Sequence, residues 1–279
     1  MAEDQSRPPE RLRGFLESGG PVVGSVVGVA ISVVMGPVLG AGAGAAIGEA
    51  LSRVGTEFYD RVLAPRQAAR AGGALSVAVA RIGERLSAGE ELREDGFFDP
   101  GPDGRADADE VLEGTLLTAA NAWEERKVAP LGRMYANLAF DASIAPGWAN
   151  YLLRVVDGLT YTQLLLLAFV DEADRGGEYE RVVVNLSSVA SEVRREPDAT
   201  LYAQLDGLST AQLVGIRQQS GAPVPPAETF GGGRWFPSSI VNASLMPTGR
   251  VLHDLMELNV LPREELDALV DGIRGDRDP

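Results

Sequence analysis

The sequence predicts a mainly α-helical protein: a glycine-zipper helical segment near the N-terminus, a helical bundle, and a C-terminal winged-helix-like module with a small β-hairpin. Three observations lead to this prediction. Apolar residues recur at spacings of three and four through the middle of the chain, as on one face of a helix. A long segment near the N-terminus is uncharged and carries a small residue at every fourth position. In the C-terminal part, helical patterns precede a Gly- and Pro-rich hairpin candidate and one further helix.

The 279 residues allow one large or two modest domains with a real core. We divide the chain into five parts by composition and pattern. They are a flexible tail (1–19), the glycine-zipper segment (20–56), a helical region with an acidic loop at 90–110 (57–158), the winged-helix-like module (159–260), and a C-terminal helix with its tail (261–279).

Composition excludes several classes of function. The chain has no Cys and a single His, which rules out disulfides, Cys-built zinc sites and multi-His metal sites. Its net charge of −15 argues against nucleic-acid binding, because such proteins neutralise phosphates with clustered Lys and Arg. We find no catalytic, cofactor or metal motif, and we expect no enzyme activity and no cofactor.

Pro21 to Gly48 is the most unusual stretch: its 28 residues carry no charge, and the nearest charged residues on either side are Glu17 and Glu49. A membrane-spanning helix needs about 20 apolar residues. A face made of small residues lets another backbone approach closely, which holds membrane helices together. Pro37 leaves open one kinked helix or two short helices in a hairpin. The alternative is a buried Gly/Ala helix or a low-complexity hinge in a soluble protein. The predicted helix-packing and self-association residues are Gly20, Gly24, Gly28, Ser32, Gly36, Gly40, Gly44 and Gly48.

Two regions on either side of the acidic loop, Leu51–Gly89 and Val111–Phe169, have helical periodicity. We expect Gly72 and Gly73 to interrupt the first helix, and Pro130 and Pro146 to lie in the first turns of later ones. Trp123 and Trp148 are expected to pack between helices, with a place at a membrane interface as the alternative. Residues 124–127 are predicted to form a solvated face. The apolar stripes are Leu75, Val79, Ile82 and Leu86; Val111, Leu112, Thr115, Leu116 and Ala119; Leu131, Met134, Tyr135, Leu138 and Ala139; and Leu152, Leu153, Val155 and Val156.

The acidic loop superficially resembles a calcium-binding loop. Its Asp99, Asp103, Gly104, Asp107 and Glu110 fall at loop positions 1, 5, 6, 9 and 12. Position 3 is a glycine and two prolines stiffen the start, so we favour an exposed acidic loop whose Asp107 or Asp109 begins the next helix. Whether the loop binds a cation stays open.

The C-terminal module begins with a helix over 161–170. We expect a capping box formed by Thr160 and Gln163 to start this helix, and we expect the helix to be the most buried element. Further helices are expected over 182–196 and over 200–208 or slightly beyond, then a hairpin around 230–236, a helix capped by Thr248 and a last helix over 262–273. The helix that would read DNA in such a module, over 200–213, has no Lys or Arg, which favours a structural or protein-binding role. His253 is interpreted as a solvated or half-buried helical residue next to Asp254.

Three stretches carry a family resemblance: residues 124–141 (EERKVAPLGRMYANLAFD), 161–167 (YTQLLLL) and 245–250 (LMPTGR). The layout resembles the abortive-infection alpha proteins and their uncharacterised prokaryotic relatives. There, a Gly-rich or apolar N-terminal segment precedes a helix with P-L-x-x-x-x-A-N, a helix with L-T/S-x-x-Q/D-x-x-x-L and an L-T-x-x-G ending. The similarity spans roughly residues 50–258. It implies a bacterial membrane-associated or phage-defence role, and no functional residue is carried over. Pro-Thr-Gly at 247–249 and the long 220–240 loop depart from the pattern.

The sequence therefore favours a non-enzymatic, membrane-associated bacterial protein at the inner membrane or in the cytoplasm. It would contact membrane lipid, self-associate through the glycine zipper and, as an antiviral defence effector, perturb the membrane. The alternative is a soluble helical scaffold or partner-binding protein whose Gly-rich segment packs inside an oligomer. A protein partner is left unidentified, and no nucleic acid is expected.

Overall fold

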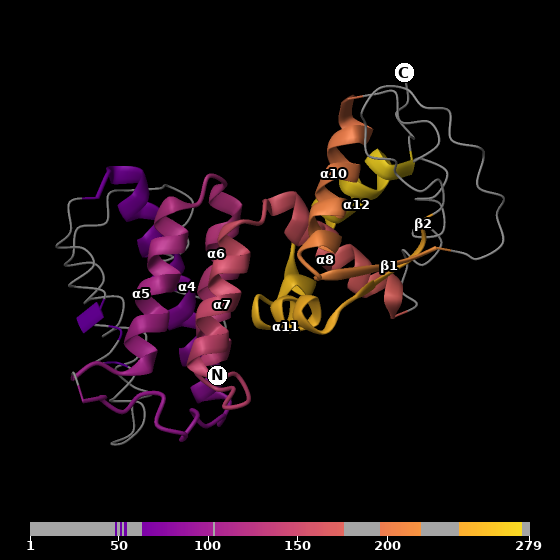
Figure 1. The fold of residues 1–279 in the computed structure, drawn as a ribbon. Coiled ribbons are helices and arrows are strands. Elements are labelled where there is room, and N and C mark those ends of the chain that lie inside the picture. The colour runs from indigo at the N-terminus through magenta and orange to yellow at the C-terminus, as the bar shows by residue number, and fades with distance from the viewer. Residues whose placement is uncertain are drawn as a thin grey trace, which may run out of the picture. The chain divides into compact units, whose positions relative to one another are not determined.

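The computed structural model describes residues 48, 51, 53, 54, 63–102, 104–175, 196–218 and 240–274. In these residues the chain is mainly helical, with eight α-helices and one two-stranded antiparallel sheet (Figure 1). It divides into two compact units, Met1–Asp157 and Gly158–Pro279. The predicted mainly helical class with a small β element is confirmed. Of the predicted glycine zipper, only Gly48, which is helical and half-buried, lies within the described residues.

Over residues 63–157, the described part of the first unit contains four α-helices. They are α4 (Pro65–Ser87), α5 (Asp107–Asn121), α6 (Val128–Leu138) and α7 (Pro146–Asp157), with the short 3-10 helix η1 (Glu125–Lys127) before α6. Helix α4 packs on α5 and α6, and α5 packs on α6 and α7. The predicted apolar stripes form this core. Every residue of the stripes on α5 and α6 is buried, and so is every residue of the stripes on α4 and α7 except Leu86 and Val155, which are half-buried.

Helix α4 runs through Gly72 and Gly73 without a break, so the predicted interruption is wrong. The physical reason is close packing. A Cβ on Gly73 would lie 3.1 Å from Val128 Cγ1. A Cβ on Gly132 of α6 would lie 2.8 Å from Val77 Cβ and would also meet the Ala74 carbonyl oxygen. Burial at this helix crossing offsets the cost of about 1 kcal/mol that a glycine imposes on a helix.

The acidic loop leads into α5 as predicted. The helix begins at Asp107, and the carboxylate of Asp109 accepts a hydrogen bond from the Ala106 backbone N–H at 3.0 Å. Residues 90, 91, 94, 95, 99 and 107 of the acidic stretch are exposed. Asp103 lies outside the described residues, so the resemblance to a calcium loop is untested. Asp109, unlike these exposed acidic residues, is buried and pairs with Arg53.

Two predictions about the turn between α5 and α6 are wrong. Trp123 is 96% exposed and does not pack between helices. Lys127 belongs to no solvated face, because it is 4% exposed and its Nζ donates hydrogen bonds to the carbonyls of Val156 and Asp157, at 3.0 and 3.3 Å. The last carbonyls of α7 lack partners within their own helix, and a buried ammonium satisfies two of them.

The second unit is organised around α8 (Tyr161–Asp174), which extends four residues beyond its predicted end. The capping box is confirmed: the Gln163 N–H donates to Thr160 Oγ1 at 3.2 Å, and the Thr160 N–H donates to Gln163 Oε1 at 2.9 Å. Eleven of its 14 residues are buried. Helices α10 (Glu196–Thr210), α11 (Pro247–Leu255) and α12 (Arg263–Arg274), strand β2 (Ile240–Leu245) and the 3-10 helix η2 (Leu258–Val260) all contact it.

The sheet pairs β1 (Val214–Gln218) with β2 in antiparallel register, Val214 opposite Leu245 and Ile216 opposite Ala243. Of the predicted helix over 182–196, only Glu196 lies within the described residues, where it is the first residue of α10. The hairpin residues 230–236 lie outside the described residues. The predicted third helix is α10, which begins four residues earlier than expected. The predicted last helix, over 262–273, is α12 within one residue at each end.

The start of α11 differs from the prediction. Its N-cap is Met246, with Pro247 as the first helical residue, so Thr248 lies inside the first turn and does not cap the helix. Gly249 explains the local sequence. A Cβ at this position would collide with the Leu213 carbonyl oxygen, which also accepts a hydrogen bond from the Met246 N–H at 2.9 Å. The glycine thus lets α11 lie directly on the backbone that leads into β1.

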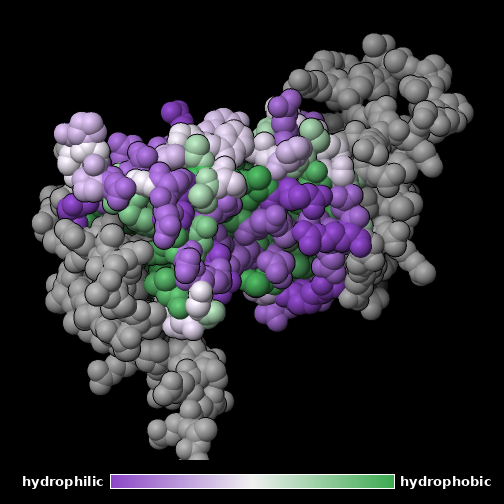
Figure 2. Space-filling model, turned by 90° about the horizontal axis from the view of Figure 1, so that it is seen from below, coloured by the Kyte–Doolittle hydropathy of each residue, from purple (hydrophilic) through white to green (hydrophobic). Residues whose placement is uncertain are grey.

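Within the described residues no single helix is long and apolar enough to cross a membrane. Helices α7 and α8, which are joined by a sharp bend, reach the required length and apolar composition only when they are taken together. On the face shown in Figure 2, hydrophilic residues cover most of the described surface, and hydrophobic residues appear in smaller groups between them.

Candidate functional site

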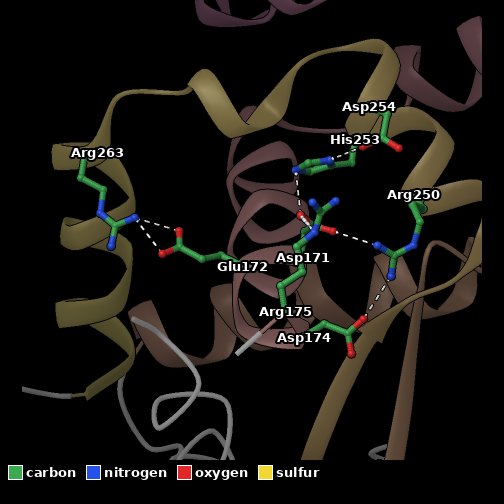
Figure 3. Close-up of polar contacts among 8 residues, drawn as sticks. All are labelled: Asp171, Glu172, Asp174, Arg175, Arg250, His253, Asp254 and Arg263. Atoms are coloured by element: carbon green, nitrogen blue, oxygen red, sulfur yellow. Dashed lines mark hydrogen bonds and ion pairs between the residues drawn. The ribbon is translucent and has the colours of Figure 1, made fainter. Parts of the chain in front are cut away.

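A cluster of charged side chains on the second unit is the strongest candidate for a functional site (Figure 3). Helix α8 supplies Asp171, Glu172 and Asp174 near its C-terminal end, followed by Arg175 as its C-cap. Helices α11 and α12 contribute the facing residues Arg250, His253, Asp254 and Arg263.

Asp171 is the centre of the cluster. Its side chain is 6% exposed and has three partners. Arg250 Nη1 lies 3.2 Å from Oδ1, while Arg175 Nε and His253 Nε2 lie 2.8 and 3.4 Å from Oδ2. A buried carboxylate is costly unless it is paired, and here both oxygens are occupied by donors from the same chain.

His253 is buried, which corrects the prediction of a solvated or half-buried residue. Its Nδ1 lies 2.9 Å from Asp254 Oδ1 and its Nε2 faces Asp171. Both ring nitrogens are therefore engaged with carboxylates of the protein. A general base needs a nitrogen that can reach the proton of a substrate, so this arrangement suits a structural link between α8 and α11 and not proton transfer.

Two further ion pairs surround this centre. Arg250 Nη2 contacts Asp174 Oδ2 at 3.1 Å, so one guanidinium bridges two carboxylates of α8. Arg263 Nη1 contacts both oxygens of Glu172, at 2.9 and 2.8 Å, and ties α12 to α8. Both arginines are more than 40% exposed, so water screens these pairs and each contributes little to stability.

A cavity of about 360 Å³ opens beside the cluster. This volume lies at the lower end of the range for small-molecule sites, roughly 300–1,000 Å³. Apolar side chains and polar ones both line it. The lining residues are Ala168, Asp171, Glu172, Arg175, His253, Asn259, Leu261, Arg263 and Leu266.

A second buried polar group lies in the first unit. The hydroxyl of Tyr135 and the Oδ1 atom of Asp109 are buried without a hydrogen-bond partner among the described residues. Burial, with the charge of Asp109 as a second cause, raises the pKa of Tyr135 well above its ordinary value. Such unpaired groups are a cost to folding, and nothing around them indicates a ligand.

The sequence did not single out the cluster on the second unit. Its members are far apart in sequence: Asp171 and Arg250 are separated by 79 residues. One local signal was present, four charged residues at the end of an otherwise apolar helix. The predicted packing residues from Gly20 to Gly44 lie outside the described part of the chain, so the structure does not test them.

The described ranges contain no group of three or more His, Asp or Glu side chains placed to hold a metal ion. Comparison of the chain with protein-family models, curated proteins and solved structures finds no match. The resemblance to abortive-infection alpha proteins therefore stays a prediction.

Proposed function

We propose that this chain is a non-enzymatic, membrane-associated protein whose segment Pro21–Gly48 inserts into the bilayer and self-associates. One observation carries the proposal: the 28 uncharged residues with a small residue at every fourth position. Without side chains on one face, two such helices can approach closely enough for backbone contact, which stabilises helix pairs in lipid.

The residues that directly follow this segment support a mechanical connection to the first unit. Leu51 is 0% and Val54 4% exposed, and Arg53 pairs with the buried carboxylate of Asp109 at the start of α5. A movement of the zipper segment would therefore act on α5 through this ion pair, in which Asp109 is buried and Arg53 is 38% exposed. Separation of the pair would leave the buried carboxylate of Asp109 without its cation, which is costly.

Exposed aromatic side chains on the first unit also support a membrane surface. Trp148 and Tyr151 of α7 stack with ring centroids 4.9 Å apart, and they are 37% and 49% exposed. Trp123 is almost fully exposed. Trp and Tyr concentrate at the boundary between lipid and water, where an apolar ring and a polar tip are both satisfied.

In this proposal the second unit is a winged-helix-like module that receives a protein partner. The order α8, α10, β1, β2, α11 supports that comparison. Helix α10, in the place of a recognition helix, has no Lys or Arg and three acidic residues, so it suits a protein partner and not DNA. A defence role would follow if partner binding released zipper oligomers that perturb the membrane.

The test of membrane association introduces charges and keeps the buried Leu51 and Val54 unchanged. Each charge in the centre of a membrane helix costs about 3 kcal/mol, so Val27→Arg with Val34→Arg should move the protein from the carbonate-washed membrane pellet to the supernatant. Val27→Leu with Val34→Leu is the matched control and should remain in the pellet. Recovery of all three proteins in the supernatant would refute membrane insertion.

Self-association is tested separately. Gly28→Leu with Gly40→Leu should reduce oligomer mass in detergent, because the added side chains separate the backbones. Val29→Leu with Val38→Leu adds bulk off the small-residue face and should leave the oligomer unchanged. Equal oligomer mass for both pairs would contradict the zipper.

A second candidate function is a soluble scaffold. The burial of Leu51 and Val54 favours it, because a segment whose C-terminal end is buried in the core of the first unit can also pack its preceding residues against that core. In that case the wild-type protein stays in the supernatant, and Gly28→Leu with Gly40→Leu lowers its thermal stability.

A further inference from the structure

The cavity beside the charged cluster has more hydrogen-bond donors than acceptors to offer a ligand. Both oxygens of Asp171 are already paired within the protein: Oδ1 with Arg250, and Oδ2 with Arg175 and His253. Both oxygens of Glu172 already accept from Arg263. The acidic side chains of the lining are thus occupied within the protein, and a cation entering the cavity would have to displace an arginine.

Donors remain available. The guanidinium of Arg175 uses only Nε on Asp171, and its two Nη groups have no partner among the described residues. Its side chain is 58% exposed at the cavity. The exposed amide of Asn259, from η2, lies in the same lining and engages no described group. A planar guanidinium with two outward nitrogens matches the geometry of a carboxylate.

Part of the cavity lining is apolar. Ala168, Leu261 and Leu266 form this part and are 4%, 8% and 4% exposed. A ligand that reaches them would gain by covering apolar surface, while its charged end stays beside Arg175.

From these observations we propose that the cavity binds a small organic carboxylate: an anionic head held by Arg175 and Asn259 and a short apolar body against Leu261 and Leu266. The site lies wholly in the second unit and does not depend on the membrane proposal.

The experiment is calorimetric titration of the full chain with sodium hexanoate. Hexylammonium chloride, with the same apolar body and the opposite charge, is the comparison ligand at equal ionic strength. We expect saturable binding of hexanoate and no saturable binding of hexylammonium. Equal binding of the two, or no binding of hexanoate, would overturn the proposal.

Three variants locate the site. Arg175→Gln should weaken hexanoate binding by about tenfold or more, since a hydrogen bond to a charged group contributes 1.5–3 kcal/mol. Arg154→Gln, an exposed arginine on α7 of the other unit, is the matched control and should bind as wild type. Ala168→Leu adds bulk to the apolar part of the lining without changing a charge and should also abolish binding. It provides a second test of the site if Arg175→Gln fails to fold. Unchanged affinity in a folded Arg175→Gln or Ala168→Leu variant would refute this placement.

Discussion

The unpaired hydroxyl of Tyr135 gives the sharpest stability prediction. The side chain is 0% exposed in the core of the first unit, and its oxygen has no hydrogen-bond partner among the described residues. Burying an unpaired hydroxyl costs about 1–3 kcal/mol. Tyr135→Phe keeps the ring and its packing, so we expect it to stabilise the first unit by about 1 kcal/mol at pH 7. That corresponds to an increase in Tm of about 2–4 °C for a domain of this size.

The effect should grow in alkali. The pKa of Tyr135 is raised in the fold, so the neutral form is favoured there, whereas the unfolded side chain ionises near its ordinary value of 10.0. Above pH 10 the folded state therefore holds more protons than the unfolded state, and wild-type stability falls as the pH rises. One pH unit above 10.0 the wild type loses about 1.4 kcal/mol through this group, and Tyr135→Phe does not.

Urea unfolding at pH 7 and pH 11 measures both effects. Tyr151→Phe is the control, because its ring is half exposed and its hydroxyl can reach water in either state. It should change stability by less than about 0.5 kcal/mol. Destabilisation by about 1 kcal/mol or more at pH 7 would refute the reasoning, because the hydroxyl would then have to donate a favourable hydrogen bond. The unpaired Oδ1 of Asp109 is one candidate acceptor.

Two further predictions concern the first unit. Gly132→Ala should destabilise it by about 2 kcal/mol or more, because the added Cβ meets the Ala74 carbonyl and Val77. Gly147→Ala is the control: its Cβ would have no heavy atom of a neighbouring group within 4 Å, so it should be neutral or stabilising. Equal thermal midpoints for the two variants would contradict the close crossing of α4 and α6. Lys127→Met should destabilise by about 1–3 kcal/mol by leaving two carbonyls of α7 without their donor. Burial lowers the pKa of Lys127, so just below pH 10.5 the unfolded state binds more protons than the folded state, and wild-type stability rises with pH. The difference in unfolding free energy between the wild type and Lys127→Met, measured by urea unfolding between pH 8 and 10, should therefore also rise with pH. A difference that does not change with pH would argue against burial of Lys127.

The sequence predicted much of the helical architecture because the signals are local. The capping box at Thr160 and Gln163 placed the start of α8, and Pro146 placed the start of α7. The stripe from Leu131 to Ala139 identified the buried face of α6. These features depend on the spacing of residues within one helix, and that spacing is visible in the sequence.

Predictions failed where a residue's environment comes from elsewhere in the chain. Lys127 looked like part of a polar run, and it is buried because the end of α7 supplies two carbonyls. Gly72 and Gly73 looked like helix breakers, and α4 continues because α6 packs closely there. Trp123 looked like a core residue, and its turn leaves it in solvent.

By itself the sequence determined the helical class, the positions of most helices and the existence of an uncharged small-residue segment, because periodicity, caps and charge are properties of neighbouring residues. Only the tertiary structure decided the charged cluster and its cavity. Asp171 and Arg250 meet across 79 residues of chain, and His253 becomes buried only when α11 lies against α8. Contacts of that kind depend on how helices pack, and no spacing along a single helix specifies them.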